Sequence, residues 1–240
     1  VRPSIASDSF GDFATVWTSM HNVGIYAQRF DINGNKVLGE FNVNTPTISS
    51  NQLPIISYDS KGNFIVAWYG YGASDGPDIF AQRFDLNGNK IGSEFKVNVG
   101  ESGDQETPQI KMDRNGNFII TWGDWRRGNG EIYAQRYDSN ANKIGNEIIV
   151  NDYIIDIQKN PDITILPNGK FAIGWESWKT DTNYDIQYKI LSCFSICENG
   201  IKDTGESDID CGGSCSACAE GKSCSDNTDC QSIYCNPNNY

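Results

Sequence analysis

The hydrophobic residues of this chain fall into short runs whose spacing suits β-strands. Residues 25–30 largely alternate between apolar and polar side chains, whereas residues 64–68 form an unbroken apolar run. Alternation is typical of a strand with one face on a core, and a short unbroken run is typical of a strand buried on both faces. Because almost no segment carries the 3.6-residue apolar period of a helix, the pattern predicts an all-β protein.

Three residue types recur in a fixed register four times along residues 1–192. A glycine marks each repeat, with a proline eight residues before it and a tryptophan six residues after it. The glycines are Gly11, Gly62, Gly116 and Gly169, the prolines are Pro3, Pro54, Pro108 and Pro161, and the tryptophans are Trp17, Trp68, Trp122 and Trp175. The period of 51 to 54 residues lies within the range of repeated sheet units such as propeller blades.

Each repeat predicts a sheet of four short antiparallel strands. The first strand is expected to open at the proline and the second to contain the tryptophan. The third carries Ala-Gln-Arg in three repeats, and an Asn-Gly turn or its equivalent joins it to a fourth strand that ends in Val-Asn. Such sheets stack radially as blades or pair as sandwiches, and we favour a β-propeller-like domain.

The last of the four repeats is incomplete. Residues 185–190 lack the Ala-Gln-Arg sequence, and no fourth strand precedes Cys193. We therefore expect an open sheet edge, which the other terminus, another part of a longer chain or a neighbouring copy could pair.

All eight cysteines lie near the end of the chain, which predicts a second domain. They are Cys193, Cys197, Cys211, Cys215, Cys218, Cys224, Cys230 and Cys235. We divide the chain into a repeat domain, residues 1–192, and a cysteine-rich module, residues 193–240. An even number of cysteines with few large apolar neighbours is typical of a disulfide module from an oxidising compartment. We expect four disulfides with their pairing left open, and disfavour zinc because the module has no histidine and no paired CxxC spacing.

Both parts of the chain resemble known extracellular sequences. Gly-Asn-Phe-Ile-Val-Ala-Trp at 62–68, Ile-Phe-Ala-Gln-Arg-Phe-Asp-Leu-Asn-Gly-Asn-Lys at 79–90 and Glu-Phe-Lys-Val-Asn at 94–98 resemble the repeats of large secreted microbial surface proteins. That resemblance implies a propeller-like fold, a role in adhesion or surface structure, and secretion to the cell surface. Residues 197–213 together with 229–235 are similar to a cysteine-rich module of extracellular microbial proteins.

The charge of the chain limits the partners that we expect. A formal net charge of −12 and a pI near 4.5 argue against nucleic acids and anionic membranes, because phosphate contacts require clustered Lys and Arg. The sequence contains no run of eighteen apolar residues, so it predicts no membrane-spanning segment. The chain starts at Val1, which suits a processed mature end or an excised fragment.

Aromatic residues mark one candidate binding site. Three residues beyond each repeat tryptophan stand Met20, Tyr71, Trp125 and Trp178. The aromatic members could stack on sugar rings or anchor a protein partner, with Asp124, Arg126, Arg127 and Glu176 as polar neighbours. They could equally pack between adjacent sheets, which is the interpretation we prefer.

Carboxylates suggest a calcium site in the cysteine-rich module and turns elsewhere. Asp203, Glu206, Asp208 and Asp210 concentrate oxygen ligands beside Cys211, so Ca²⁺ is the one cofactor considered. A solvated acidic turn is the alternative. The Asp-x-Asn-Gly-Asn segments at 31–35, 85–89 and 113–117 are interpreted as hairpin turns, because their glycine comes too early for a calcium loop.

The repeated arginines are interpreted as structural. Arg29, Arg83 and Arg136 each precede a turn aspartate, namely Asp31, Asp85 and Asp138. We expect ion pairs that stabilise turns or join neighbouring sheets, in preference to a ring that grips an anionic ligand.

Motifs for catalysis are missing from the sequence, so we expect no enzymatic activity. His21 is the single histidine and has no nucleophile motif beside it. The expected function is that of an extracellular structural or adhesion protein that self-associates into a surface array or filament, with itself, other extracellular proteins or glycans as partners. The alternatives are a carbohydrate-binding module and a glycoside hydrolase, whose paired carboxylates meet in space and not in sequence.

Overall fold

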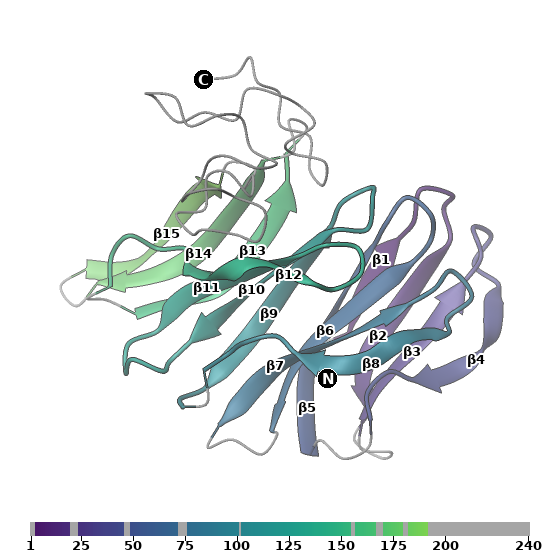
Figure 1. Cartoon of the computed structure of the whole chain (residues 1–240), viewed down its shortest axis with the longest axis horizontal. Coiled ribbons are helices and arrows are strands. Elements are labelled where there is room, and N and C mark those ends of the chain that lie inside the picture. The colour runs from purple at the N-terminus through teal and green to yellow at the C-terminus, as the bar shows by residue number, and fades with distance from the viewer. Residues whose placement is uncertain are drawn as a thin grey trace, which may run out of the picture.

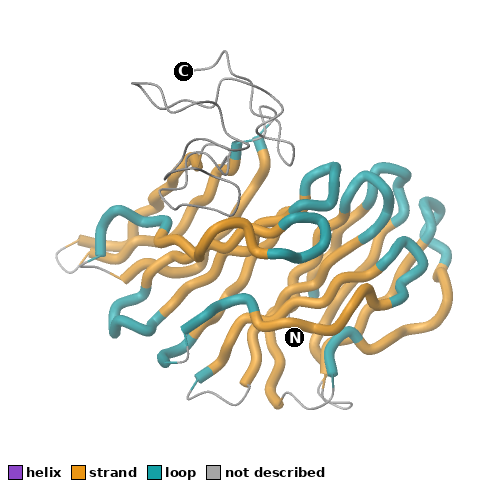
Figure 2. The backbone as a smooth tube through the Cα atoms, in the orientation of Figure 1, coloured by secondary structure: helices purple, strands orange, loops and turns teal. Residues whose placement is uncertain are grey.

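The computed structural model describes residues 3–19, 24–45, 49–71, 76–100, 102–154, 157–166, 170–179 and 182–191. Within these ranges the chain forms strands, turns and loops, as the tube in Figure 2 makes clear. The expectation of an all-β protein is therefore confirmed. The cysteine-rich module, residues 193–240, lies outside the described residues.

The strands form four antiparallel sheets, each a simple meander in chain order. Sheet 1 contains β1 (Ser4–Ser7), β2 (Phe13–Ser19), β3 (Gly24–Phe30) and β4 (Lys36–Asn42). Sheet 2 contains β5 (Ser49–Tyr58), β6 (Phe64–Tyr71), β7 (Pro77–Phe84) and β8 (Lys90–Lys96). Sheet 3 contains β9 (Gln105–Met112), β10 (Phe118–Asp124), β11 (Glu131–Tyr137) and β12 (Lys143–Ile149). Sheet 4 contains β13 (Ile157–Ile165), β14 (Phe171–Lys179) and β15 (Thr182–Leu191).

Neighbouring sheets pack face to face in chain order. The first strand of each sheet lies across the preceding sheet: β5 on β1, β2 and β3, β9 on β5, β6 and β7, and β13 on β9, β10 and β11. Figure 1 shows this row running from the purple sheet 1 to the green sheet 4. No comparable packing joins sheet 4 back to sheet 1 among the described strands.

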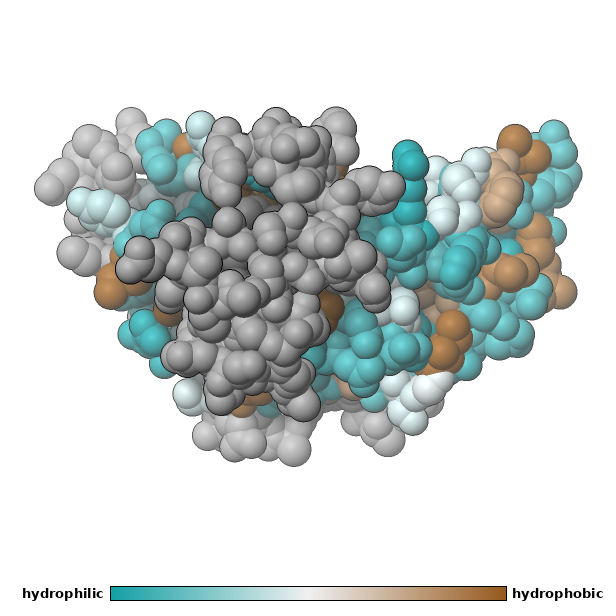
Figure 3. Space-filling view, turned by 45° about the horizontal axis from the view of Figure 1, so that its top comes forward, coloured by the Kyte–Doolittle hydropathy of each residue, from teal (hydrophilic) through white to brown (hydrophobic). Residues whose placement is uncertain are grey.

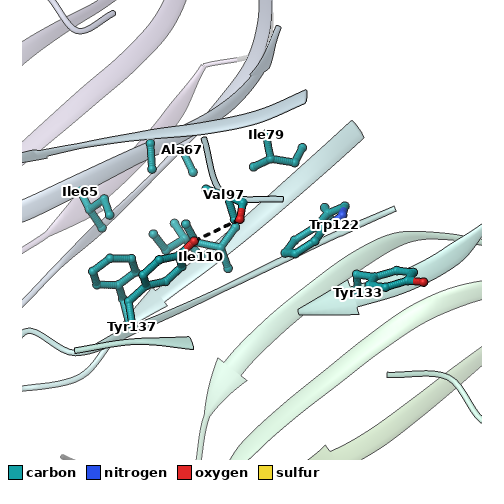
Figure 4. Packing of buried hydrophobic residues seen from close by; sticks show 11 residues of the cluster. Ile65, Ala67, Ile79, Val97, Ile110, Trp122, Tyr133 and Tyr137 are labelled. Carbon is teal, nitrogen blue, oxygen red and sulfur yellow. Dashed lines mark hydrogen bonds between the residues drawn. The ribbon is translucent and has the colours of Figure 1, made fainter. Parts of the chain in front are cut away.

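Each of the three junctions between successive sheets contains a hydrophobic core, because the apolar side chains on the facing surfaces of the two sheets pack against one another. The core between sheets 2 and 3 combines Ile65 and Ile79 with Trp122 and Tyr137 (Figure 4). The Tyr137 hydroxyl donates a hydrogen bond to the Val97 carbonyl, 3.3 Å away. The repeated register predicted from the sequence thus corresponds to equivalent positions in equivalent sheets.

The repeat tryptophans occupy the same place in all four sheets but are not equally covered. Each is paired in register with the third strand, and each of Trp68, Trp122 and Trp175 is buried. Trp17, stacked on Tyr26, is only partly buried because no described sheet precedes sheet 1.

The expectation that the first strand opens at the proline is wrong for three of the four repeats. Pro54 lies inside β5, and the residue before it, Leu53, has a positive φ of 48°. Thr107 before Pro108 has a φ of 51°, and the pairing register of β9 with β10 shifts at this point. The proline therefore sits in a β-bulge, where its missing N–H removes no ladder hydrogen bond.

The Asp-Asn-Gly segments form hairpin turns, as predicted. In the turn between β3 and β4, Asp31 Oδ1 accepts the N–H groups of Asn33 and Asn35, and Oδ2 accepts the side-chain amide of Asn35. Asp85, Asp113 and Asp138 accept the same set of hydrogen bonds in their own turns. The carboxylate oxygens are thus occupied by the turn itself.

A glutamate of the fourth strand joins neighbouring sheets, which the sequence did not indicate. Glu94 of β8 accepts the N–H of Thr45, just after the last strand of sheet 1, at 2.6 Å, and Glu147 of β12 accepts the N–H of Val99, just after the last strand of sheet 2, at 3.1 Å. The recurring Glu of the fourth strand is therefore a fixed link between successive sheets.

Among the described residues there is no helix long and apolar enough to cross a membrane.

Candidate functional site

The candidate aromatic residues stand at one end of neighbouring sheets. Tyr71 closes β6, Trp125 follows β10 directly, and Trp178 is the penultimate residue of β14. Tyr71 and Trp178 are exposed, whereas Trp125 is partly buried. Met20 and His21 lie outside the described residues.

Trp125 packs against residues of its own sheet, and the preferred interpretation of packing between sheets stays a prediction. Its indole N–H donates a hydrogen bond to Glu106 Oε1 at 3.1 Å. Its ring lies so close to Gly130 that a Cβ there would be 3.2 Å from two ring atoms. The Gly130 carbonyl in turn accepts the N–H of Gln158, at the start of sheet 4. The shape of this loop therefore depends on Trp125, and the ring is not a free binding surface.

Trp178 differs from Trp125, because it is exposed on a surface against which no described strand packs. We call this surface the outward face of sheet 4, meaning the side chains of β13, β14 and β15 that point away from sheet 3. Its members are Ile157, Lys159, Asp162, Thr164, Ala172, Gly174, Glu176, Trp178, Tyr184, Ile186, Tyr188 and Ile190. The alternating residues of β14, such as Phe171, Ile173 and Trp175, are buried against sheet 3.

Trp178 and Tyr184 form a stacked aromatic pair on this face. Their ring centroids lie 6.0 Å apart with an interplanar angle of 21°. The Lys159 ammonium lies 4.8 Å from the centroid of the Tyr184 ring and 3.4 Å from its hydroxyl. Lys159 also lies 3.8 Å from a carboxylate oxygen of Glu176. Two exposed rings thus border a cation and a carboxylate.

This arrangement is suited to a ligand with both apolar and hydroxyl surfaces. Aromatic faces cover the C–H side of a flat ring, and a Lys–Glu pair offers both donors and acceptors to hydroxyl groups. The sequence pointed to Trp178 and Glu176 but not to Lys159 or Tyr184, because those two join the site through strand pairing.

Asp124 and Arg126, the neighbours of Trp125 on either side, belong to a structural cluster, whereas Arg127 is exposed. Asp124 is fully buried and accepts hydrogen bonds from the Trp122 indole, at 2.9 Å, and from the Arg126 guanidinium. Arg126 also pairs with Glu147 and lies over the ring of Tyr133, 4.4 Å from its centroid. Burial alone would lower the pKa of Arg126, but the hydrogen bonds to both carboxylates raise it. Arg126 therefore stays charged as the centre of this cluster.

Glu131 is another buried carboxylate beside this cluster. It pairs across the strands with Asp124 and accepts a hydrogen bond from the Asn151 amide. Burial raises its pKa, and the negative charge of Asp124 acts in the same direction. Because Glu131 and Asp124 have almost no exposed surface, neither can reach a glycan in solution.

Two of the repeated arginines reach the next sheet: Arg29 lies beside Tyr58 of sheet 2, and Arg83 reaches sheet 3. The Arg83 guanidinium donates to the Ser139 carbonyl in sheet 3. Burial lowers its pKa, and the carboxylate of Asp138, also in sheet 3, opposes that shift. The inter-sheet role expected of Arg83 is present, but its partners are Ser139 and Asp138, while Asp85 is held by its own turn.

The carboxylates proposed for calcium, Asp203, Glu206, Asp208 and Asp210, lie outside the described residues, as do the eight cysteines. Within the described ranges, no group of three or more His, Cys, Asp or Glu side chains is placed to hold a metal ion.

No family model matches the sequence, and no curated protein matches it. Solved structures, however, share the fold. An endo-arabinase from Bacteroides thetaiotaomicron is 18% identical with a TM-score of 0.52, over 78% of this chain and 74% of the enzyme. An alpha-L-arabinofuranosidase from Lactobacillus brevis is 13% identical with a TM-score of 0.51, over 78% of this chain and 66% of the enzyme. A thermostable family-43 glycoside hydrolase is 13% identical with a TM-score of 0.51, over 78% of this chain and 67% of the enzyme. This chain has a fold that glycoside hydrolases use.

These neighbours overturn the expected function. The sequence predicted a structural or adhesion protein without enzymatic activity that self-associates into an array or filament, and the similar folds are those of glycan-cleaving enzymes. The prediction failed because it relied on sequence motifs. Glycosidase chemistry needs only two carboxylates brought together by the fold.

Proposed function

We propose that this protein acts on glycans and binds a sugar chain on the outward face of sheet 4. The observation that carries the proposal is the exposed Trp178–Tyr184 stack with Lys159 and Glu176 beside it. Exposed aromatic rings with a few convergent polar groups are what recognition of a sugar ring requires. The likeness of the fold to arabinan-cleaving enzymes supports the same ligand class.

Replacing one ring tests the binding proposal. Trp178→Ala removes half of the stack, and we expect the affinity for arabino-oligosaccharides, measured by calorimetry, to fall about tenfold, which corresponds to about 1.4 kcal/mol. Tyr71→Ala is the matched control, because it removes an exposed aromatic from the equivalent end of sheet 2. Equal affinities of wild type and Trp178→Ala, with both folded, would contradict the proposal.

Glycoside hydrolysis is a second candidate function, favoured by a pair of carboxylates on the same face. Asp162 pairs across the strands with Gly174, and Glu176 stands two residues further along β14. The backbones of such diagonal neighbours lie roughly 7–8 Å apart, so their two side chains can bring the carboxyl groups to a separation of this order. Two carboxyl groups at about 6.5–9.5 Å are the arrangement of inverting glycosidases, in which one protonates the leaving oxygen and the other activates water. Gly174 leaves the space between them free of a side chain.

Conservative substitutions separate hydrolysis from binding. We expect Asp162→Asn and Glu176→Gln each to reduce the release of reducing ends from arabinan by on the order of a hundredfold while sugar binding persists. Asp185→Asn changes a carboxylate on the opposite face of sheet 4 and serves as the control. Absence of hydrolysis by the wild type across arabinan and xylan would remove this candidate and leave the binding proposal standing.

We also infer that the four sheets are successive blades of a β-propeller. The packing of each first strand on the preceding sheet supports this inference. The eight cysteines of residues 193–240 support secretion and four disulfides, and the carboxylates at 203–210 support a calcium-stabilised loop. Mass mapping of the disulfides in secreted protein tests the four disulfides. Repeating the mapping with a calcium chelator tests the calcium-stabilised loop.

A further inference from the structure

No described strand packs on the outward face of sheet 4, whereas the corresponding face of each of the other three sheets is covered by the next sheet. Ile132 of sheet 3 is fully buried by the first strand of sheet 4, and its register equivalent in sheet 4, Ile186, is 69% exposed. Ala134 is 1% exposed and its equivalent, Tyr188, is 75% exposed. The exposed residues alternate along β15, so they share one face of the strand. They are Tyr184, Ile186, Tyr188 and Ile190.

The residues on this face differ from those at the covered junctions. The position of Tyr188 is held by alanine in each of the other sheets, namely Ala27, Ala81 and Ala134, all buried. An alanine there lets the next first strand lie against the sheet. A tyrosine projects into the volume which that strand would occupy. Another sheet therefore cannot dock on sheet 4 in the way that sheets 2, 3 and 4 dock on their predecessors.

The remaining residues make the face flat and rich in aromatic surface. Ala172 and Gly174 add only a methyl group and no side chain at the centre of the face. Tyr188 extends the aromatic surface away from the Trp178–Tyr184 stack. Along β15, Tyr184 and Tyr188 are separated by roughly 13 Å, since a strand rises about 3.3 Å per residue. That distance exceeds the width of one sugar ring, so one monosaccharide cannot contact both tyrosines.

Four exposed large hydrophobic side chains of the described residues follow one another along one face of β15. Figure 3 shows hydrophobic residues of the visible described surface in small groups separated by hydrophilic ones. Contiguous exposed apolar surface marks an interaction site on a soluble protein. The net charge of −12 disfavours polyanions at such a site, and a neutral sugar chain carries no charge to be repelled.

We propose that the outward face of sheet 4 is an extended binding surface for a neutral, linear polysaccharide that runs along β15. One sugar stacks at Trp178 and Tyr184, and a later unit of the same chain stacks on Tyr188. This inference rests on the proposed glycan function and specifies its ligand as a chain of several neutral sugars.

Chain length is the variable that tests this surface. We expect the affinity of the intact protein for linear arabino-oligosaccharides to rise about tenfold between the disaccharide and the hexasaccharide. In Tyr188→Ala that rise is lost while disaccharide binding is unchanged. Tyr153→Ala, which removes an exposed tyrosine from a loop outside the face, behaves as the wild type. Oligogalacturonides of equal length, which are anionic, bind more weakly than the neutral series.

The outcomes separate this inference from the proposed function. If Tyr188→Ala and wild type bind the hexasaccharide equally while Trp178→Ala loses binding, the extended surface is wrong and the glycan site stands. If the wild type binds no member of either series, the proposed function fails as well. Sedimentation that reveals a dimer dissociated by Tyr188→Ala would assign the face to a second copy and overturn the inference.

Discussion

The indole of Trp178 stacks on the phenol ring of Tyr184 across two strands of sheet 4, with 6.0 Å between the ring centroids. The stack holds both rings in a fixed orientation before any ligand arrives. Side chains ordered in advance lower the entropic cost of binding. Lys159, which contacts the Tyr184 ring and hydroxyl, fixes the second ring further.

The first prediction separates the two parts of Tyr184. Tyr184→Phe keeps the stack but removes the hydroxyl near Lys159, and we expect glycan affinity to change by less than about threefold. Tyr184→Ala removes the ring, and we expect a loss of about tenfold. Calorimetry with arabino-oligosaccharides measures both. A larger loss of glycan affinity in Tyr184→Phe than in Tyr184→Ala would contradict the stacking role.

The second prediction concerns the buried charges of sheet 3. Arg126→Met leaves Asp124 and Glu147 buried without their cation, so we expect the free energy of unfolding to fall by about 3–5 kcal/mol. Lys189→Met removes the exposed ion pair with Asp152, and we expect a change of less than about 1 kcal/mol. Urea denaturation followed by tryptophan fluorescence compares the two. Equal effects would mean that the Arg126 cluster contributes no more than a surface pair.

The third prediction concerns stability at alkaline pH. Burial raises the pKa of Tyr58 to about 12, although the nearby Arg29 opposes the shift, and burial also raises the pKa of Tyr137. An unfolded tyrosine ionises near pH 10. Below pH 10 both states are protonated and the stabilisation is complete. Between pH 10 and 12 the unfolded state loses protons that the folded state keeps, so the free energy of unfolding falls by roughly 2–3 kcal/mol for Tyr58 alone.

Denaturant titrations from pH 9 to pH 12 check this behaviour. Tyr58→Phe is expected to flatten the fall, whereas Tyr153→Phe, an exposed tyrosine, leaves it unchanged. A fall of the same size in Tyr58→Phe would show that other groups cause it.

The fourth prediction concerns the turn between β11 and β12. Ala141 has a φ of 67°, and the equivalent positions in sheets 1 and 2 are the glycines Gly34 and Gly88. Because an L-residue is strained at positive φ, Ala141→Gly should raise the free energy of unfolding by on the order of 1 kcal/mol. Ala172→Gly, in an extended strand, should lower it by roughly the same amount. A melting temperature unchanged by Ala141→Gly would argue against strain at this turn.

The sequence predicted the repeated sheets well because its signals are local. Alternation in residues such as Ile25 to Phe30 and the Asp31 turn depend only on neighbours along the chain, and both occur as predicted. The bulge before Pro54 was missed, because a positive φ at Leu53 has no composition signal. The link between Glu94 and Thr45 was missed because it joins two sheets.

The candidate site was only partly predictable for the same reason. Trp178 was found from its place in the repeat, whereas Lys159 and Tyr184 reach it through strand pairing. One signal was present and overlooked: Tyr188 stands where three repeats have alanine. A bulky residue at a position that is otherwise small marks a sheet that is not covered.

The order of packing determines where this protein opens first. Sheets 2 and 3 each rest on two neighbours, whereas sheets 1 and 4, at the two ends of the row, each have one described neighbour. Separating sheet 4 therefore breaks a single hydrophobic interface, while releasing a central sheet breaks two. Amide hydrogens of β14 and β15 should exchange with solvent sooner than those of β6 and β10, and a ligand held on sheet 4 should slow that local exchange before it alters global unfolding.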